Sequence, residues 1–534
     1  MGIPLTATNR ILALSPILLL FFGILALKQS AHKAGGAVWV FTAVLAAAVF
    51  KLSAQGLFYA CGKGLSLSLY VLLIIWTAVF LYNVADRAGA VRAIGNTVTG
   101  LVHDRLLQCL LLAWCFTSLL QGLAGFGVPV AVVAPIMTSM GFEPLAAAAA
   151  CLVGHSWAIS FGSMGSSYNT IQLVTKIPGE VIGPAMAMLF VVPIFVTGLS
   201  VLHIQDGFRG VARGFAPFFP AACLISLTLW GMNKLGMAQL ASLVAAASGV
   251  AVLLVCARIR DGGASANRDP ARARGGNSAK VPARTAGEPG GGEDMRFLIA
   301  AMPYILLICV SLITQIPFVK DAFSGFALGF DYPEITTGLG YTVPAVKGYS
   351  AITWISHPAP ALFLSAIAGY FLYVKKTGAD PGLLKRAAAD TVKKIIPVSA
   401  GITAMVMTAL IMSDSGMTNL LARGIASAMG PFFPLASPFI GMIGSFLTGS
   451  NTNSNVMFGL LQYETALAIG KNAVWLAAAQ SVGGSVGVSI SPAAIMMGSA
   501  NVGLAGRENT VMAKTLRYCL IGAAVLAIAV FLIA

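Results

Sequence analysis

Two short polar stretches, rich in glycine, serine and asparagine, stand out in an otherwise apolar sequence. Residues 160–170 read SFGSMGSSYNT and residues 448–455 read TGSNTNSN. Hydroxyl and amide side chains can donate hydrogen bonds to a carboxylate, and glycines let the backbone approach a ligand. Backbone N–H groups at the start of a helix also attract an anion. Because such polar groups are costly at membrane depth unless something uses them, the two turns predict a binding site for a small organic acid, with solvated loops as the alternative.

The candidate binding residues come from these turns and from the segments just before them. They are Gly125, Gly127, His155, Ser156, Gly162, Ser163, Gly165, Ser166, Asn169, Ser450, Asn451, Thr452, Asn453 and Asn455.

Two titratable residues lie within apolar sequence and are the candidates for carrying a coupled proton. Asp414 lies in the run AMVMTALIMSDSGM, and His155 lies between two apolar stretches. An ionisable side chain at the centre of a membrane helix costs at least about 2.5–3.5 kcal/mol, so such residues are functional candidates by default. Histidine also titrates near neutral pH. A structural, hydrogen-bonded role is the alternative for each residue, and Arg423 is expected at an interface rather than on a substrate.

The composition fixes the class of protein that must position these residues. The chain has 534 residues, of which 57% are hydrophobic and only 10% are charged. Soluble domains carry about 25% charged residues, so a soluble enzyme, a nucleic-acid binder and a disordered scaffold are excluded. The net charge of +15 fits basic cytoplasmic loops of a membrane protein. The eight cysteines are scattered without a CxxC, so no disulfide, metal site or cofactor is predicted.

The apolar runs predict an all-α polytopic membrane protein with about 12–14 transmembrane helices, because each span needs about 20 apolar residues. Shorter glycine-broken pieces at 124–140 and 414–430 are expected to be broken or re-entrant helices. Residues 258–296 are polar and rich in Gly, Pro and Arg, which predicts a disordered cytoplasmic linker. It divides an N-terminal membrane half (1–257) from a C-terminal half (297–534), and loop 317–357 is placed outside. The predicted spans are 11–27, 37–52, 65–82, 105–121, 143–161, 183–203, 215–233, 236–257, 297–316, 358–374, 395–412, 433–449, 472–490 and 517–534.

The two halves show signs of an internal repeat. The sequence from Gly127 matches the sequence from Gly416 through shared glycines, a shared Met-Gly pair and a shared Pro-Leu-Ala triplet. Each matched segment runs into one of the two polar turns. Many secondary transporters consist of two related halves, with the substrate site at their interface near the membrane midplane. Whether this repeat is inverted or parallel stays open, because the basic segments before both copies look cytoplasmic.

Five separated motifs resemble the lactate permease family and cover most of the chain in order. They are QGLAGFGVPV at 121–130, FGSMG at 161–165, FLTGS at 446–450, SISP at 489–492 and VGLAGRE at 502–508. The resemblance implies a proton-coupled inner-membrane permease for lactate and related 2-hydroxy acids such as glycolate. It also implies kinship with the ion-transporter superfamily, whose members have paired re-entrant hairpins and move their substrate by a rigid-body shift. A homodimer is possible within this picture.

The sequence departs from the family pattern at five positions. The family has an acidic residue at Gln121, Asp at Asn451, Asn at His155, Lys at Val488 and Gln at Ala493. Two acids and one base are thus neutral here, while a histidine is gained. Carrying one negative charge inward against the membrane potential costs about 2.3 kcal/mol per 100 mV, and a co-transported proton cancels this cost. The departures therefore affect the predicted proton route most and the predicted substrate second.

Three other function classes stay open or are disfavoured. GGSVG at 483–487 fits the G-x-S-x-G pattern of serine hydrolases, but no histidine follows His357 to serve as the base. A sodium-coupled carboxylate carrier stays open, since Asn, Ser and Thr oxygens can coordinate Na⁺. A passive organic-anion channel also stays open, although channels favour rings of fixed charge or carbonyl filters. The expected partners are the lipid bilayer, a monocarboxylate and H⁺, with Na⁺ possible and no nucleic acid.

Overall fold

The computed structural model describes residues 3–27, 29–100, 102, 104–123, 125, 128–265, 295–314, 318–319, 327–355 and 357–534. In the first half the helices are α1 (Ala7–Phe21), η1 (Phe22–Ala26), α2 (Ala31–Ala48), α3 (Ala54–Arg87), α4 (Ala90–Gly100), α5 (Arg105–Cys109), η2 (Leu110–Phe116), α6 (Thr117–Leu123), α7 (Val128–Ser139), α8 (Pro144–Gly154), η3 (Ser156–Ala158), α9 (Gly162–Thr175), α10 (Gly179–Lys234) and α11 (Ala238–Ser265). In the second half they are α12 (Phe297–Thr314), α14 (Pro358–Thr377), α15 (Leu383–Asp414), α16 (Met417–Met429), η5 (Gly430–Phe432), α17 (Phe433–Thr448), α18 (Asn451–Ala468), α19 (Ala473–Val488), α20 (Pro492–Asn501) and α21 (Glu508–Ile533).

The helices confirm a multi-pass α-helical membrane protein. In the described part of the chain, 10 helices are long and apolar enough to cross a membrane, or 11 if the pair Pro144–Ala158 and Gly162–Thr175, bent by 51°, is one span. The sequence predicted about 12–14 spans. The difference arises partly because α10 contains both predicted spans 183–203 and 215–233, joined across non-helical backbone at Asp206 and Gly207. In addition, α2 and α12 supply shorter apolar helices than a full span needs.

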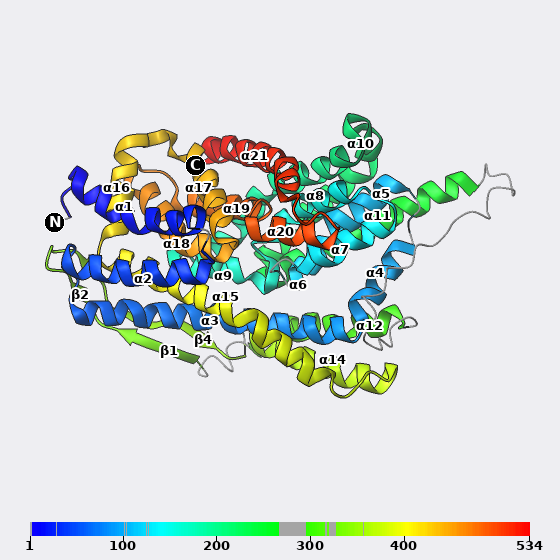
Figure 1. The fold of residues 1–534 in the computed structure, drawn as a ribbon, viewed down its shortest axis with the longest axis horizontal. Coiled ribbons are helices and arrows are strands. Elements are labelled where there is room, and N and C mark those ends of the chain that lie inside the picture. Colours follow the sequence, from blue (N-terminus) through cyan, green and yellow to red (C-terminus); the bar gives the residue numbers. More distant parts are fainter. Residues whose placement is uncertain are drawn as a thin grey trace.

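Four short strands lie in the described part of the segment that the sequence predicted only as an external loop. Strand β1 (Ala327–Tyr332) pairs antiparallel with β4 (Val346–Thr353), and β2 (Ile335–Thr336) pairs antiparallel with β3 (Thr342–Val343). Tyr332 and Tyr349 are buried against α3, because their rings join an apolar cluster with that helix. The strands lie at the left of Figure 1, whereas the C-terminal end of α11 projects to the right. This placement puts the hairpin and the start of the predicted linker at opposite ends of the molecule.

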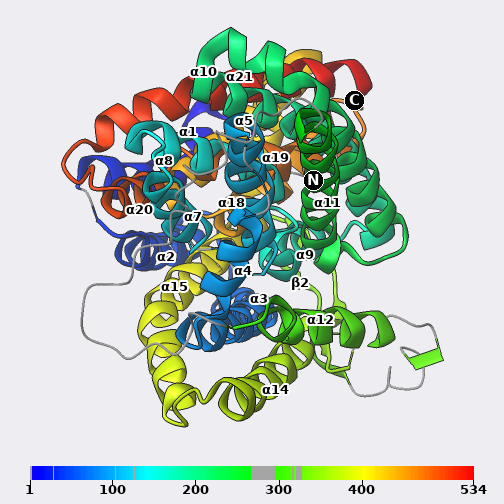
Figure 2. The same ribbon diagram turned by 90° about the vertical axis from the view of Figure 1, so that its right-hand side faces the viewer.

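The two chain halves pack together through helix pairs that are distant in sequence. Helix α3 lies against α14 and α15, and α10 lies against α19 and α21. Figure 2 shows α3, α12, α14 and α15 as a layer below the larger group of helices. Helix α11 continues from Arg258 to Ser265, so these first residues of the predicted disordered linker are helical. The rest of the linker's predicted disorder, over 266–294, lies outside the described residues.

The matched sequence segments fold into similar successions of elements. In the first half α7 and α8 lead into a turn and then α9, and in the second half α16 and α17 lead into a turn and then α18. Helices α8 and α17 both have proline in their first turn, where its missing N–H is no loss. The correspondence concerns only the order of the elements along the chain, so the internal repeat stays a prediction.

Helices α17 and α19 approach each other through glycines. A Cβ atom at Gly441 would overlap the carbonyl oxygen of Gln480, and one at Gly483 would overlap that of Pro438. Small residues allow this close backbone approach, which membrane helices use because apolar burial does not distinguish protein from lipid. Because α17 ends at Thr448, this contact helps to fix the position of the second polar turn.

We expect Gly483→Ala to destabilise the protein, because the added methyl group must push α17 and α19 apart. Overpacking of this kind costs about 1–3 kcal/mol. The midpoint of thermal unfolding of detergent-purified protein should fall by several degrees. Gly36→Ala in α2 is the matched control, since no atom lies within 4 Å of a Cβ at that helical glycine. Equal midpoints for the two variants would contradict the close-packing account.

Candidate functional site

The two polar turns meet inside the molecule. The hydroxyl of Ser167, near the start of α9, lies 3.0 Å from the Thr452 hydroxyl. Asn451 Nδ2 donates to Ser160 Oγ at 2.9 Å, and Asn455 Nδ2 donates to the Ser167 carbonyl oxygen at 2.9 Å. All five residues are buried. Hydrogen bonds therefore join the two polar turns across the two halves of the chain, while the Oδ1 atoms of Asn451 and Asn455 accept none from the described residues.

Helix α19 holds the joint between the turns together. Ser160 Oγ donates to the Ser481 carbonyl oxygen at 3.0 Å, and Ser481 Oγ accepts from Asn455 Nδ2 at 2.9 Å. Ser485 Oγ donates to the Ser156 carbonyl oxygen at 2.7 Å. The sequence analysis did not select Ser481 or Ser485 for the site. The glycines and the serine at 483–487 could have indicated a close helix contact, but the sequence analysis considered them only as a hydrolase pattern.

Unusual backbone conformation shapes the first turn. Ser163, Met164 and Gly165 have φ values of 46°, 55° and 73°, in the left-handed region that non-glycine residues seldom adopt. Such strain persists where the surrounding structure enforces it, often at ligand sites. Ser163 Oγ accepts a hydrogen bond of 2.8 Å from the Gly125 N–H, which ties the first family motif to the turn. Gly127, also a predicted site residue, lies outside the described residues.

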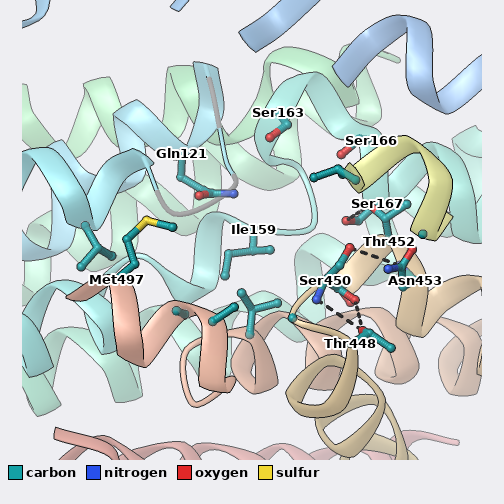
Figure 3. A pocket seen from close by; sticks show the side chains of 18 of the residues that line it. Gln121, Ile159, Ser163, Ser166, Ser167, Thr448, Ser450, Thr452, Asn453 and Met497 are labelled. Atoms are coloured by element: carbon teal, nitrogen blue, oxygen red, sulfur yellow. Dashed lines mark hydrogen bonds between the residues drawn. The ribbon is translucent and has the colours of Figure 1, made fainter. Parts of the chain in front are cut away.

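A cavity of about 380 Å³ lies beside the joined turns. Figure 3 shows Ser163, Ser166 and Ser167 on one side of it, facing Thr448 and Ser450. Seven predicted site residues line it: His155, Ser163, Ser166, Ser450, Asn451, Thr452 and Asn453. Gly125, Ser156, Gly162 and Asn455 do not line it but contact residues of its wall or of the joined turns, and Gly165 does not line it either. Asn169 is buried on α9 and does not line it.

Three helices begin at this cavity. Helix α9 contributes Ser163, Ser166 and Ser167, all near its start. Ser450 caps the start of α18, and Ser491 caps the start of α20, whose Ala493 and Ala494 also line the cavity. The first N–H groups of a helix lack partners within it and carry partial positive charge. At α18 and α20 the capping serines accept from one such group each, Asn453 N–H and Ala494 N–H. The convergence of the three helix starts makes the cavity attractive to an anion.

His155 is the predicted proton carrier that reaches the cavity. Its Nδ1 atom lies 2.7 Å from the carbonyl oxygen of Cys151, which can only accept, so Nδ1 carries a hydrogen. The hydrogen bond leaves Nε2 as the nitrogen that can gain or lose a proton. His155 is 3% exposed, so a proton on Nε2 would strongly affect an anion in the same cavity.

Asp414 does not line the cavity. Its Oδ2 atom lies 2.9 Å from Nζ of Lys63 on α3, and the two side chains are 6% and 5% exposed. The sequence analysis missed Lys63, because only tertiary contact shows that α3 brings it to the end of α15. The predicted role of Asp414 in proton coupling stays a prediction. Arg423 donates to the Ile3 carbonyl oxygen at 3.2 Å, at the packing contact between α16 and the chain's start.

The described residues contain no group of three or more His, Cys, Asp or Glu side chains placed to hold a metal ion. What the cavity offers is a set of hydrogen-bond donors, three helix starts and few ionisable groups. Hydrogen-bond donors and helix starts are chemically suited to a small anion, and the imidazole of His155 is suited to gaining and losing a proton.

Comparison with known proteins shows the family of the chain. A family model for L-lactate permease matches residues 9–534 of the chain. The chain belongs to the L-lactate permease family. The glycolate permease GlcA of Escherichia coli strain K12 is 28% identical over 97% of this chain and 94% of its own length. The L-lactate permease of Bacillus subtilis strain 168 is 28% identical over 96% of this chain and 93% of its own length.

This member of the L-lactate permease family is thus a transport protein of the cell inner membrane that crosses the bilayer many times. Among solved structures, the YdaH transporter of Alcanivorax borkumensis aligns with 93% of this chain and 98% of its own, at 15% identity and a TM-score of 0.47. A likeness of that degree does not establish a shared fold. Relatives named as permeases place the chain among transporters rather than hydrolases, and Ser485 bonds to backbone at the turn joint.

Proposed function

We propose that the protein imports L-lactate or a related small 2-hydroxy monocarboxylate such as glycolate, together with a proton. The observation that carries the proposal is the convergence of three helix starts and the two hydroxyl-rich turns on one cavity. The helix starts attract the carboxylate. Side-chain hydroxyls from Ser163, Ser166 and Thr452 supply partners for the carboxylate and for the neighbouring 2-hydroxyl group.

The size and the apolar wall of the cavity suit a small acid. About 380 Å³ is near the lower end for ligand pockets. Val130, Ile159 and Met497 form an apolar part of its wall, where the methyl group of lactate can lie. Glycolate lacks that methyl group, so one extra carbon would favour lactate by about 1 kcal/mol, within a tenfold preference.

Proton coupling is proposed to run through His155. Its Nε2 atom can hold a proton beside the bound carboxylate, so that the anion and its proton together carry no net charge across the membrane. In the family pattern an acidic residue and an aspartate stand where this chain has Gln121 and Asn451. A histidine in the same cavity can take over the proton that those acids would carry.

Sodium coupling is the second candidate, and the asparagines of the second turn favour it. The Oδ1 atoms of Asn451, Asn453 and Asn455 are buried and accept no hydrogen bond from the described residues. Amide oxygens are suitable ligands for hard cations. Sodium-driven uptake with no effect of pH would support this reading and reject the proton route.

Uptake by cells tests the substrate. We expect a bacterium that lacks its own lactate and glycolate permeases to accumulate labelled L-lactate when it expresses this protein. Unlabelled glycolate should compete, whereas the dicarboxylate succinate should not, because a second carboxylate would be buried beside Ile159 and Met497 without a counter-charge. Uptake that glycolate leaves unchanged, or that succinate blocks equally well, would contradict the proposed substrate class.

A further inference from the structure

We propose that Lys394 of α15 is the cation that pairs with the substrate's carboxylate. The inference rests on the proposed function, since it names a binding group for a monocarboxylate in the same cavity. Lys394 was not among the residues selected from the sequence, where it belonged to a basic segment expected in the cytoplasm. Its side chain lines the central cavity together with the two turns.

The charge content of the cavity points to this residue. Its described lining holds no aspartate or glutamate, and its ionisable residues are His32, His155 and Lys394. Of these three, only the lysine keeps a full positive charge under ordinary conditions. Helix starts contribute partial charges only, so a bound anion with a full negative charge gains most from the ammonium group.

Lys394 is also available to a ligand. Within the described residues it takes part in no hydrogen bond or ion pair, although other charged residues of the same region do: Arg87 Nε lies 2.6 Å from Asp390 Oδ2. A lysine ammonium has three donors and a flexible stem, so it can reach an anion and follow it. Arg87 and Asp390 pair with each other, and Asp86, which lines the neighbouring cavity, attracts Lys394 electrostatically without an ion-pair contact among the described residues. Lys394 is therefore the cation that lines the central cavity itself.

A second cavity also has Lys394 in its wall. It has a volume of about 310 Å³ and shares Lys394 and Met497 with the central cavity. Asp86, Arg87 and Asp390 form its polar wall. Lys394 therefore lies where the two cavities meet. An anion leaving the turns would pass this ammonium group.

Equilibrium binding to purified protein in lipid nanodiscs tests the proposal. The probe is labelled L-lactate, and the competitor of interest is lactamide, a neutral amide of nearly the same shape. We expect Lys394→Gln to raise the dissociation constant for lactate about tenfold or more, the usual cost of a lost charged hydrogen bond. The affinity for lactamide should hardly change, and Lys394→Arg should retain most of the lactate affinity. Lys393→Gln is the matched control, because this neighbouring lysine is exposed, as Lys394 is, but does not line the cavity.

The outcomes separate this inference from the proposed function. Equal lactate affinity in Lys394→Gln and wild type would overturn the role of Lys394 and leave the lactate proposal intact. An equal loss of lactate and lactamide binding would also overturn it, because that result indicates a structural role. If the wild type binds another small monocarboxylate but not lactate or glycolate, the substrate proposal fails, and the same variants then test Lys394 with that acid. Binding of no carboxylate to the wild type would overturn both.

Discussion

A His155→Asn variant is expected to bind and exchange lactate but to lose accumulation driven by a pH gradient. A carrier that moves one proton with each lactate anion can build a lactate ratio of about tenfold for each pH unit across the membrane, since one pH unit corresponds to about 1.4 kcal/mol. Asparagine can still donate to the Cys151 carbonyl oxygen, so the local structure should persist. It cannot hold a proton, so the accumulated ratio should fall to about one.

The readouts are uptake and counterflow in proteoliposomes. Counterflow, the exchange of labelled for unlabelled lactate without a gradient, should continue in His155→Asn, and protein-free liposomes correct for diffusion of lactic acid. The double variant His155→Asn with Asn451→Asp returns an acid of the family pattern to the cavity and is expected to regain part of the accumulation. A His155→Asn variant that accumulates lactate as wild type does would show that the proton travels elsewhere.

Removing one partner of the Lys63–Asp414 pair is expected to have the second large effect. Both side chains are almost completely buried, so either single neutral substitution leaves a charge without its counter-ion. Such a change typically costs about 3–5 kcal/mol. Asp414→Asn and Lys63→Met should each lower the thermal midpoint and the yield of folded protein. The double variant Lys63→Met with Asp414→Leu should recover much of the loss, because apolar replacements of a buried pair are often tolerated.

The same variants test the predicted proton role of Asp414. If Asp414 carries the proton, the double variant should be stable but should fail to accumulate lactate under a pH gradient. Full accumulation in that stable variant would remove Asp414 from the coupling mechanism and leave it as the structural partner of Lys63. Surface pairs such as Arg386–Asp380 serve as the control, since an exposed ion pair contributes only about 0–1 kcal/mol.

The sequence predicted the elements of the site better than their connections. The turns were identifiable because Ser and Asn side chains are expensive within apolar sequence. Their meeting across the molecule followed from the expectation that two related halves enclose a site. The sequence analysis did not identify Ser481, Lys63 or Lys394. Their positions depend on packing between helices that are far apart in sequence, which brings them to Ser160, Asp414 and the cavity.

The fold shows the same limit. Hydropathy identified the long helices, since a span must be apolar along its whole length. It did not show that α10 joins two spans in one bent helix, because Asp206 and Gly207 break the helix within a short polar segment. The strands around Tyr332 and Tyr349 were also not predicted. Short strands in a polar loop have little hydrophobic periodicity, and these strands depend on packing against α3.

The central claim is that the joined turns bind a 2-hydroxy monocarboxylate and that a proton moves with it. The most direct measurement is uptake of labelled L-lactate into proteoliposomes under imposed pH or sodium gradients, with glycolate as competitor. We predict accumulation driven by a pH gradient, independent of sodium and suppressed by glycolate. Accumulation driven by sodium alone would contradict the proton route, and equilibration without accumulation under either gradient would indicate a passive anion channel.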